Sequence, residues 1–594
     1  MEGKKVKNSI FYFACSILFG AITFLIGLVS QKANIDISTS RIIIFSIISV
    51  FLCYSLLQPT IRSKLKHYCA DIDWVDASID FYNSIPAIYR KSFWISFLFI
   101  NIAFLFHTIN FMWGAFDWDA IRTSVDTQSS IKNGNFTSFL LQNILFNGKI
   151  LPIINNLWSF IGLALSGVLL CIYWDMPKKT STFVITTLFF TVTPYTLGWL
   201  YFAQNTLGNL WVPTFILSSL ILSQKTPTSL EKNYLYNLFS IGLFLIALGT
   251  YFPCISFIAI AILGKIFLTI IYNNTSLKQT FVKELQCCAN LMASLLIYIF
   301  VIILLKNNYN TPFIDNISFY NIIENFSLLI SSIFTQFITP LPFIDISYKV
   351  LCLILVLFAT FVFINKSPSS KSVIKGLCLL PIILIATKIS VLLFSDPTSP
   401  HIVRIDFYGL PLFYTLMLAT LIKIDTIYIK RITYALSCLI IFMSFVRISY
   451  ALKVWKFGWD AETKLAERII TRMEKMPEFD ISRQYKLLQI GEMSLRNKYY
   501  LATPNEHQSA ELLNFAYYSP HNANDAYNFF YQTDFASDIA FFDKAIENNK
   551  IAQFILYHAR PWPAKESIQI IDDYIIFILN EKALYQAQQA ILKK

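Results

Sequence analysis

Charged residues are scarce in this chain of 594 residues: they make up 14% of it, whereas 55% of the residues are apolar. Soluble domains carry roughly 25% charged residues, so the composition excludes a string of soluble domains and predicts an α-helical polytopic membrane protein. The net charge of +12 does not indicate nucleic-acid binding, because most Lys and Arg of the apolar part stand in short loops between apolar runs. We expect membrane lipid, and no nucleic acid, among the partners.

Motifs for nucleotides, metals and disulfides are also missing. The sequence has no Walker loop, no dinucleotide-binding glycine pattern and no HExxH motif. The ten cysteines lack the spacing of a zinc site, and none follows Cys438, so the last part of the chain cannot depend on disulfide bonds. We therefore predict no metal site and no cofactor.

Long apolar runs are abundant instead. A run of about 18 or more apolar residues can cross a bilayer as a helix, and because several runs are short, we predict about 11–13 transmembrane helices. The runs lie near residues 9–30, 41–57, 92–113, 151–173, 181–200, 208–223, 235–250, 253–272, 287–305, 347–365, 376–394, 407–423 and 433–452. The basic Met1–Asn8 segment and the first run predict a retained signal anchor, and Tyr251-Phe252-Pro253 predicts a tight break between two spans.

Lys and Arg are divided unevenly between the two sets of loops. With the N-terminus inside, the outside loops hold only Lys32, Arg41, Arg122, Lys132, Lys149, Lys306 and Arg404. Because cytoplasmic loops carry the excess of Lys and Arg, we predict a cytoplasmic N-terminus. Loops 113–150, 306–346 and 395–406 are then extracytoplasmic.

The composition changes after residue 452, so we divide the chain into a membrane domain, 1–452, and an extracytoplasmic C-terminal domain, 453–594. Asp460–Met476 has apolar residues at helical spacing, and Tyr485–Ile490 is typical of a strand. Ser567–Leu579 predicts a hairpin that turns at Asp572-Asp573. The C-terminal domain is therefore predicted to be a small α/β fold.

Three other segments are predicted to be amphipathic and to lie along the membrane surface. Asp71–Tyr89 faces the inside, and Phe136–Phe146 precedes the next span on the outer face. Phe319–Phe337 is expected to form an interfacial helix within the long outer loop.

Phe116-Asp117-Trp118-Asp119-Ala120-Ile121-Arg122 concentrates charge where an apolar run ends. A carboxylate beside an apolar wall can act as a general base toward a hydroxyl group, so Asp117 and Asp119 are the candidate catalytic residues. The alternative is a solvated loop in which an acid pairs with Arg122, since Asp119 and Arg122 have the i, i+3 spacing of an ion pair. Two carboxylates without further ligands are weak evidence for a metal ion.

Two other cations could bind a phosphate group. Arg404 lies in a short outer loop, where a guanidinium can bind phosphate oxygens bidentately; the alternative is an interfacial anchor. Lys388 lies inside an apolar run, where an ammonium costs about 2.5–3.5 kcal/mol at the centre of a span. Lys388 is therefore either functional or snorkels outward. Arg447, near the end of the last span, is interpreted as a snorkelling anchor.

Aromatic and amide side chains gather in another outer segment. Tyr195, Gln204 and Asn205, with Trp118 of the acid loop, could stack on a sugar face and bind its hydroxyl groups. The alternative is an aromatic belt at the membrane interface.

These residues together resemble the Gtr-type serotype-converting O-antigen glucosyltransferases of bacteria, within the GT-C class of membrane glycosyltransferases. Asp119 and Arg122 align with the second acid and the Arg of the family's paired-acid element. Trp118 stands where the first acid is expected, with Asp117 one position earlier. Leu151-Pro152 is similar to the start of the family's next span.

The resemblance implies transfer of a hexose, commonly glucose, from a polyprenyl-phosphate carrier to a surface polysaccharide such as the O-antigen of lipopolysaccharide. It also implies a location in the bacterial inner membrane. Because the predicted site is extracytoplasmic, the enzyme cannot use cytosolic nucleotide donors, and its donor must be carried by a lipid. Asp117 or Asp119 would be the base, and Arg122, Lys388 and Arg404 would bind the donor phosphate. A lipid-linked-sugar flippase or transporter, and a polysaccharide assembly factor, are the alternatives.

Overall fold

The computed structural model describes residues 74–112, 134–146, 149–200, 208–225, 230–273, 277–309, 325–327, 329–333, 344–367, 369–390, 402–491, 527–528, 533–536 and 542–593. The chain divides into two units, Met1–Arg90 and Lys91–Lys594. The predicted runs near 9–30 and 41–57 lie outside the described residues.

The described part of the first unit holds an amphipathic helix, α4 (Trp74–Ser84), and the first turn of α5 (Ala87–Ile109). Arg90 lies over the Tyr82 ring, 4.8 Å from its centroid, and donates a hydrogen bond to Asn83 Oδ1 at 3.0 Å. The predicted segment Asp71–Tyr89 thus contains a helix.

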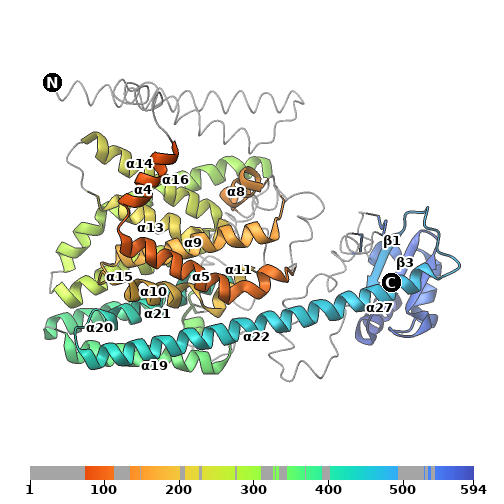
Figure 1. The fold of residues 1–594 in the computed structure, drawn as a ribbon. Helices are drawn as coiled ribbons and strands as arrows, with labels where there is room; N and C mark the ends of the chain where they lie inside the picture. The colour runs from red at the N-terminus through yellow and green to blue at the C-terminus, as the bar shows by residue number, and fades with distance from the viewer. Residues whose placement is uncertain are drawn as a thin grey trace. The chain divides into compact units, whose positions relative to one another are not determined.

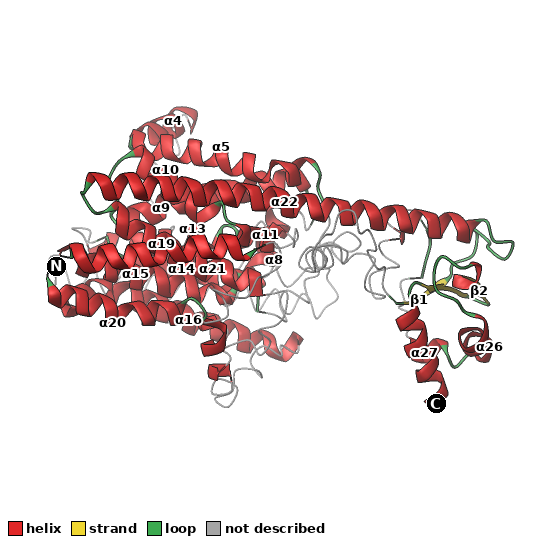
Figure 2. Cartoon of the chain, turned by 90° about the horizontal axis from the view of Figure 1, so that it is seen from below, coloured by secondary structure: helices red, strands yellow, loops and turns green. Residues whose placement is uncertain are grey.

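The second unit is a bundle of helices that run roughly side by side (Figures 1 and 2). Its helices are α5, α8 (Phe136–Phe146), α9 (Pro152–Tyr173), α10 (Thr180–Thr191), α11 (Leu197–Leu200), α13 (Val212–Ser223), α14 (Leu230–Thr250), α15 (Ile255–Asn273), α16 (Leu277–Tyr309), α19 (Ile346–Lys366), α20 (Ser370–Ala386), α21 (Ile402–Ile422) and α22 (Ile427–Glu474). Seven helices among the described residues are long and apolar enough to cross a membrane, or eight if the bent pair beginning at Thr180 is one span. The chain is a multi-pass membrane protein.

The centre of the bundle is formed around α21, which packs against α10, α15 and α19. Helix α10 also packs on α9, and α15 packs on α20. Small residues allow these close approaches. Gly409 of α21 faces the carbonyl oxygen of Thr387, and Gly167 of α9 faces the Thr187 side chain of α10; a Cβ atom at either glycine would clash.

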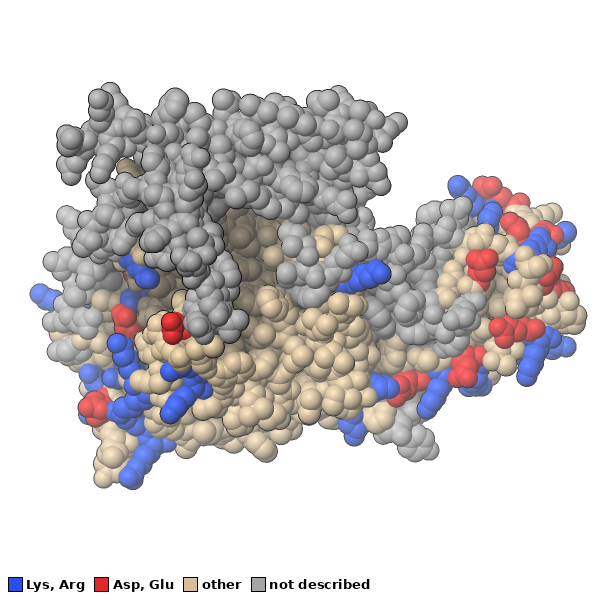
Figure 3. Space-filling view, turned by 45° about the horizontal axis from the view of Figure 1, so that its top comes forward, with Lys and Arg blue, Asp and Glu red and all other residues tan. Residues whose placement is uncertain are grey.

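The outside of the bundle is apolar. Leu98, Phe300, Leu357 and Phe442, from four different helices, are each more than half exposed. Figure 3 shows a wide surface without charged side chains on the helical part, with Lys and Arg gathered at one side. A soluble protein rarely leaves so large an apolar surface uncovered, so this surface is the lipid-facing one.

The predicted break at Tyr251-Phe252-Pro253 is confirmed: a 3₁₀ turn, η2 (Phe252–Cys254), separates α14 from α15. The predicted span 181–200 is a pair of helices that together are apolar enough to cross a membrane but are bent at a break. Helix α10 ends at Thr191, and the chain continues through η1 (Pro194–Thr196) and α11 at an angle of 50°. Pro194 explains the break, because proline cannot continue the hydrogen-bond ladder and restricts the residue before it.

Helix α22 continues without interruption from the last membrane span into the C-terminal part. The apolar run near 433–452 and all but the last two residues of the amphipathic segment Asp460–Met476 are therefore parts of one helix of 48 residues, which ends at Glu474. The sequence patterns change along this helix because its surroundings change from lipid to a small sheet, while the backbone remains helical.

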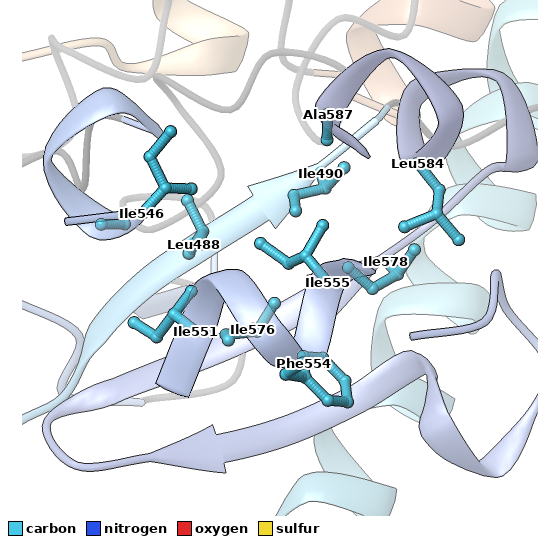
Figure 4. Packing of buried hydrophobic residues seen from close by; sticks show 11 residues of the cluster. Leu488, Ile490, Ile546, Ile551, Phe554, Ile555, Ile576, Ile578, Leu584 and Ala587 are labelled. Carbon is cyan, nitrogen blue, oxygen red and sulfur yellow. The ribbon is translucent and has the colours of Figure 1, made fainter. Parts of the chain in front are cut away.

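The C-terminal module is a three-stranded mixed sheet, β1-β3-β2, with helices packed on it. Strand β1 (Lys486–Ile490) pairs in parallel with β3 (Tyr574–Ile578), and β2 (Ile568–Ile571) pairs antiparallel with β3. The predicted hairpin and its turn are confirmed, with Asp572 at φ 54°. Figure 4 shows the core between this sheet and α26 (Asn549–Gln553), the π-helical turn η4 (Phe554–His558) and α27 (Glu581–Lys593).

Candidate functional site

Six of the predicted site residues lie outside the described residues: Asp117, Trp118, Asp119, Arg122, Gln204 and Asn205. Arg404 lies in the first turn of α21, with its backbone described. Lys388 and Tyr195 are described fully. The described part of the candidate site therefore centres on these two side chains.

Lys388 and Tyr195 lie at the same end of the bundle. This end, called the Lys388 end below, is where α5, α14 and α20 finish and where α9, α19 and α21 begin. Contacts between distant segments confirm the grouping. Tyr408 donates a hydrogen bond to the carbonyl oxygen of Asn209 at 2.9 Å, and Ser256 and Ser390 share a hydrogen bond of 3.1 Å.

Lys388 forms an ion pair with Asp406, and each residue is only 1% exposed. Lys388 follows the end of α20, and Asp406 lies in the first turns of α21. The snorkelling alternative for Lys388 is wrong, since the ammonium points into the bundle and ends on a carboxylate. A buried charge of this kind is tolerated only with a partner.

Lys349 of α19 is a third buried charge at this position, also 1% exposed, and it interacts electrostatically with both Asp406 and Lys388. One charged residue from α19, one from α21 and one just after α20 thus meet in a single buried cluster. We call Lys349, Lys388 and Asp406 the charged cluster. Its buried ammonium groups are suited to an anionic group of a ligand.

Sequence reasoning missed Lys349 and Asp406. A signal existed for each: Lys349 stands inside the apolar run 347–365, as Lys388 stands inside its own run, and Asp406 ends the short loop that holds Arg404. What the sequence did not contain is the pairing, because it depends on how α19, α20 and α21 pack.

Tyr195 is fully buried beside the charged cluster. It interacts electrostatically with Tyr414, Asp406 and Tyr348. Among the described residues, the Tyr195 and Tyr414 hydroxyl groups and the Oδ2 atom of Asp406 have no hydrogen-bond partner. An unsatisfied buried polar group costs about 1–3 kcal/mol, so these three atoms form a polar lining that a hydroxyl-bearing or anionic ligand, or water, would satisfy.

The aromatic residues near Tyr195 form an interior cluster. Trp199 is 1% exposed and contacts Tyr251 edge to face, with ring centroids 4.7 Å apart. The ring of Tyr408 lies 5.5 Å from Tyr251. The membrane-interface alternative therefore does not hold for Tyr195 or Trp199.

Arg447 of α22 is not a lipid anchor, contrary to the sequence interpretation. Its guanidinium pairs with Asp345 and donates a hydrogen bond to Ser347 Oγ at 3.1 Å. Asp345 also caps α19, since its carboxylate accepts from the backbone N–H of Tyr348 at 3.2 Å. This contact ties α22 to the start of the helix that carries Lys349.

His107, near the end of α5, is a further buried polar residue at the Lys388 end. Its Nδ1 atom shares a hydrogen bond of 3.1 Å with the Asn156 amide, and its ring stacks on Trp455 at 5.1 Å. These contacts join α5, α9 and α22, so they fix the end of the helix that precedes Asp117 in the sequence.

A surface groove and a possible metal site remain to be considered. A surface groove of about 530 Å³ on the C-terminal module is lined by Pro561, Glu581, Lys582, Leu584, Tyr585 and Gln588. Within the described ranges, no three His, Cys, Asp or Glu residues are grouped so as to hold a metal ion.

The chain matches no protein-family model, no curated protein and no solved structure.

Proposed function

We propose that the chain is a membrane glycosyltransferase that moves a hexose, with glucose as the first candidate, from a polyprenyl-phosphate carrier to a surface polysaccharide. The observation that carries this proposal is the charged cluster inside an apolar bundle. A buried ion pair contributes little or nothing to stability compared with apolar residues of the same size. Charged side chains buried inside an apolar bundle are accounted for if they bind an anion such as the carrier phosphate.

The proposed reaction is a direct displacement. A hydroxyl group of the acceptor attacks the anomeric carbon, and its proton passes to Asp117 or Asp119. The bond from the anomeric carbon to the phosphate oxygen breaks, and its electron pair stays on that oxygen. The carrier phosphate thereby changes from a monoanionic diester to a monoester with one more negative charge, and the sugar is transferred with inversion.

Catalysis in this scheme depends on the cations. Because negative charge develops on the phosphate in the transition state, ammonium and guanidinium groups fixed beside it lower the barrier. Lys388 would bind the donor phosphate. Arg404 would also bind it; this residue lies two positions before Asp406, the ion-pair partner of Lys388. Arg122 follows the two candidate bases in the sequence. Tyr195 would bind sugar hydroxyl groups.

The first experiment is transfer in isolated membranes supplied with a polyprenyl-phosphate sugar and the polysaccharide acceptor. Asp117→Asn and Asp119→Asn, singly and together, test the base, and Lys388→Met tests the phosphate site. The matched control is Lys371→Met, because Lys371 is an exposed lysine at the other end of α20. Loss of transfer in the double acid variant and in Lys388→Met, with a normal control, is expected; unchanged transfer in the double acid variant would show that the acids are not the base.

A lipid-linked-sugar flippase or transporter is the second candidate. Two observations favour it: paired charges buried in the bundle, and the broken span at Pro194, since transporters commonly use discontinuous helices around a substrate site. The composition of the surface polysaccharide with and without the gene separates the candidates. Loss of one side-branch hexose supports the transferase, loss of all export supports the flippase, and altered chain length alone supports an assembly factor.

A further inference from the structure

A second group of charged residues lies at the opposite end of the bundle from Lys388. It consists of Asp175, just after α9, Lys265 of α15, and Lys423, just after α21. Two aromatic rings, Tyr173 and Tyr272, lie against the lysines. We call these five residues the Lys423 cluster.

Lys265 is nearly buried, with 12% of its side chain exposed. Its ammonium donates a hydrogen bond to the carbonyl oxygen of Tyr173 at 2.6 Å and forms an ion pair with Asp175, whose side chain is 77% exposed. Asp175 is held in the left-handed backbone region, with φ 49°. The carboxylate is therefore turned largely toward solvent, and part of its charge is screened there.

Lys423 is half-buried, and its ammonium lies 6.0 Å from the centroid of the Tyr272 ring. In the described part of the chain, Lys423 has no carboxylate within ion-pair distance. Burial and the neighbouring Lys265 lower the pKa of Lys423 to about 8, against a smaller opposing effect of Asp175. Two like charges thus share a single exposed carboxylate.

This arrangement lacks one negative charge. The charges of the two ammonium groups and the carboxylate sum to +1. The lysines are partly buried, so water screens the repulsion between them poorly. An anion between the lysines would remove that repulsion. Phosphate oxygens are suited to the role, because an ammonium binds them as a compact charge with three donors.

The position of the cluster identifies the source of the phosphate. Asp175 and Lys423 lie just after the ends of α9 and α21, which is the level of lipid headgroups. Lys265 lies within α15, and its ammonium reaches this level through its contacts with Tyr173 and Asp175. Tyrosine is common at that level. More lysines surround this end: Lys178, Lys179, Lys366, Lys371 and Lys375. We propose that the Lys423 cluster binds the phosphate of an anionic lipid headgroup.

The site is separate from the proposed catalytic end and does not depend on glycosyl transfer. A lipid bound there would hold the C-terminal end of α21. The N-terminal end of the same helix carries Arg404 and Asp406 at the Lys388 end of the bundle.

The test is a binding titration of the purified full chain in zwitterionic nanodiscs, followed by native mass spectrometry and by melting temperature. Phosphatidylglycerol and inorganic phosphate are added in separate titrations. Lys423→Gln should weaken phosphatidylglycerol binding about fivefold, the factor that corresponds to roughly 1 kcal/mol for one lysine at an anionic surface. Asp175→Asn should tighten binding, because it removes the competing carboxylate, and asparagine tolerates the left-handed backbone.

The matched control is Lys371→Gln, because Lys371 is an exposed lysine at the same end of the bundle. This variant should change binding less than twofold. Equal losses in Lys371→Gln and Lys423→Gln would mean diffuse attraction to a basic surface and would overturn the proposal. Unchanged binding in Asp175→Asn would also overturn it. If inorganic phosphate binds as tightly with the same variant pattern, the phosphate site stands and the lipid is rejected as its source.

Discussion

The charged cluster allows a double-mutant cycle with a definite expectation. Lys388 and Asp406 are each 1% exposed and bind one another. Asp406→Leu leaves a buried ammonium without its partner, and Lys388→Met leaves a buried carboxylate. Removing one member of a buried pair costs about 3–5 kcal/mol, so each single variant should be clearly less stable than the parent chain.

The double variant, Lys388→Met with Asp406→Leu, should behave differently. Neither charge remains, and apolar side chains of similar size fill the same space between α20 and α21. Replacement of a buried pair in this way is often neutral or stabilising by about 1–4 kcal/mol. The coupling free energy in the cycle should therefore be at least about 3 kcal/mol, well above the 0.5 kcal/mol within which distant sites add.

The assay is thermal unfolding of the full chain in nanodiscs, combined with transfer activity on the same samples. Asp425→Asn is the control, because Asp425 also pairs with a lysine, Lys430, but its side chain is 95% exposed; no measurable loss of stability is expected. Additive single losses in the cycle would refute the buried pairing. A stable but inactive double variant is the result that the phosphate role requires, whereas a stable and active one would remove Lys388 from the mechanism.

Two further predictions concern the fold. Gly409→Ala should lower the free energy of unfolding by about 1–3 kcal/mol through overpacking, because a Cβ atom there meets the backbone just after α20. Gly242→Ala is the control, because a Cβ atom at Gly242 meets open space. Equal melting temperatures for the two variants would contradict the tight contact at Gly409. Hydrogen bonds from Asn548 and Lys550 lower the pKa of Asp572. Because the pKa of Asp572 is lower in the folded chain than the unfolded value of about 3.9, its ionised carboxylate stabilises the fold at pH values above about 3.9. Protection of the β2–β3 hairpin against hydrogen exchange should therefore fall as the pH drops below about 4. Asp572→Asn should lose this pH dependence.

The sequence predicted the elements whose pattern is local. The Tyr251-Phe252-Pro253 break, a helix at Phe136–Phe146 and the hairpin around Asp572 all depend on residues close together in the chain, and the structure has them. The apolar runs likewise predicted helices, since spacing and length alone decide whether a segment can cross a bilayer.

The arrangements that the sequence did not predict depend on packing between segments that are far apart in the chain. Lys388 and Arg447 were both compatible with snorkelling, and only the position of Asp406 and Asp345 on neighbouring helices decides against it. Tyr195 is buried for the same reason, because η1 turns into the bundle after Pro194 and packs on α21. Hydropathy reports how apolar a segment is, but it does not report which face another helix covers.

The two charged groups of the bundle differ in a way that bears on their roles. The Lys388–Asp406 pair is closed off from solvent on both sides, whereas Asp175 of the Lys423 cluster is largely exposed. A buried pair keeps its strength in salt, and a ligand that enters must replace Asp406 or add to it. An exposed carboxylate is partly screened by water and opposes an incoming anion less than a buried one would, so an anion at Lys423 can exchange with the surrounding lipid. The first arrangement suits a substrate held in fixed geometry, and the second suits an anchor that exchanges at the membrane surface.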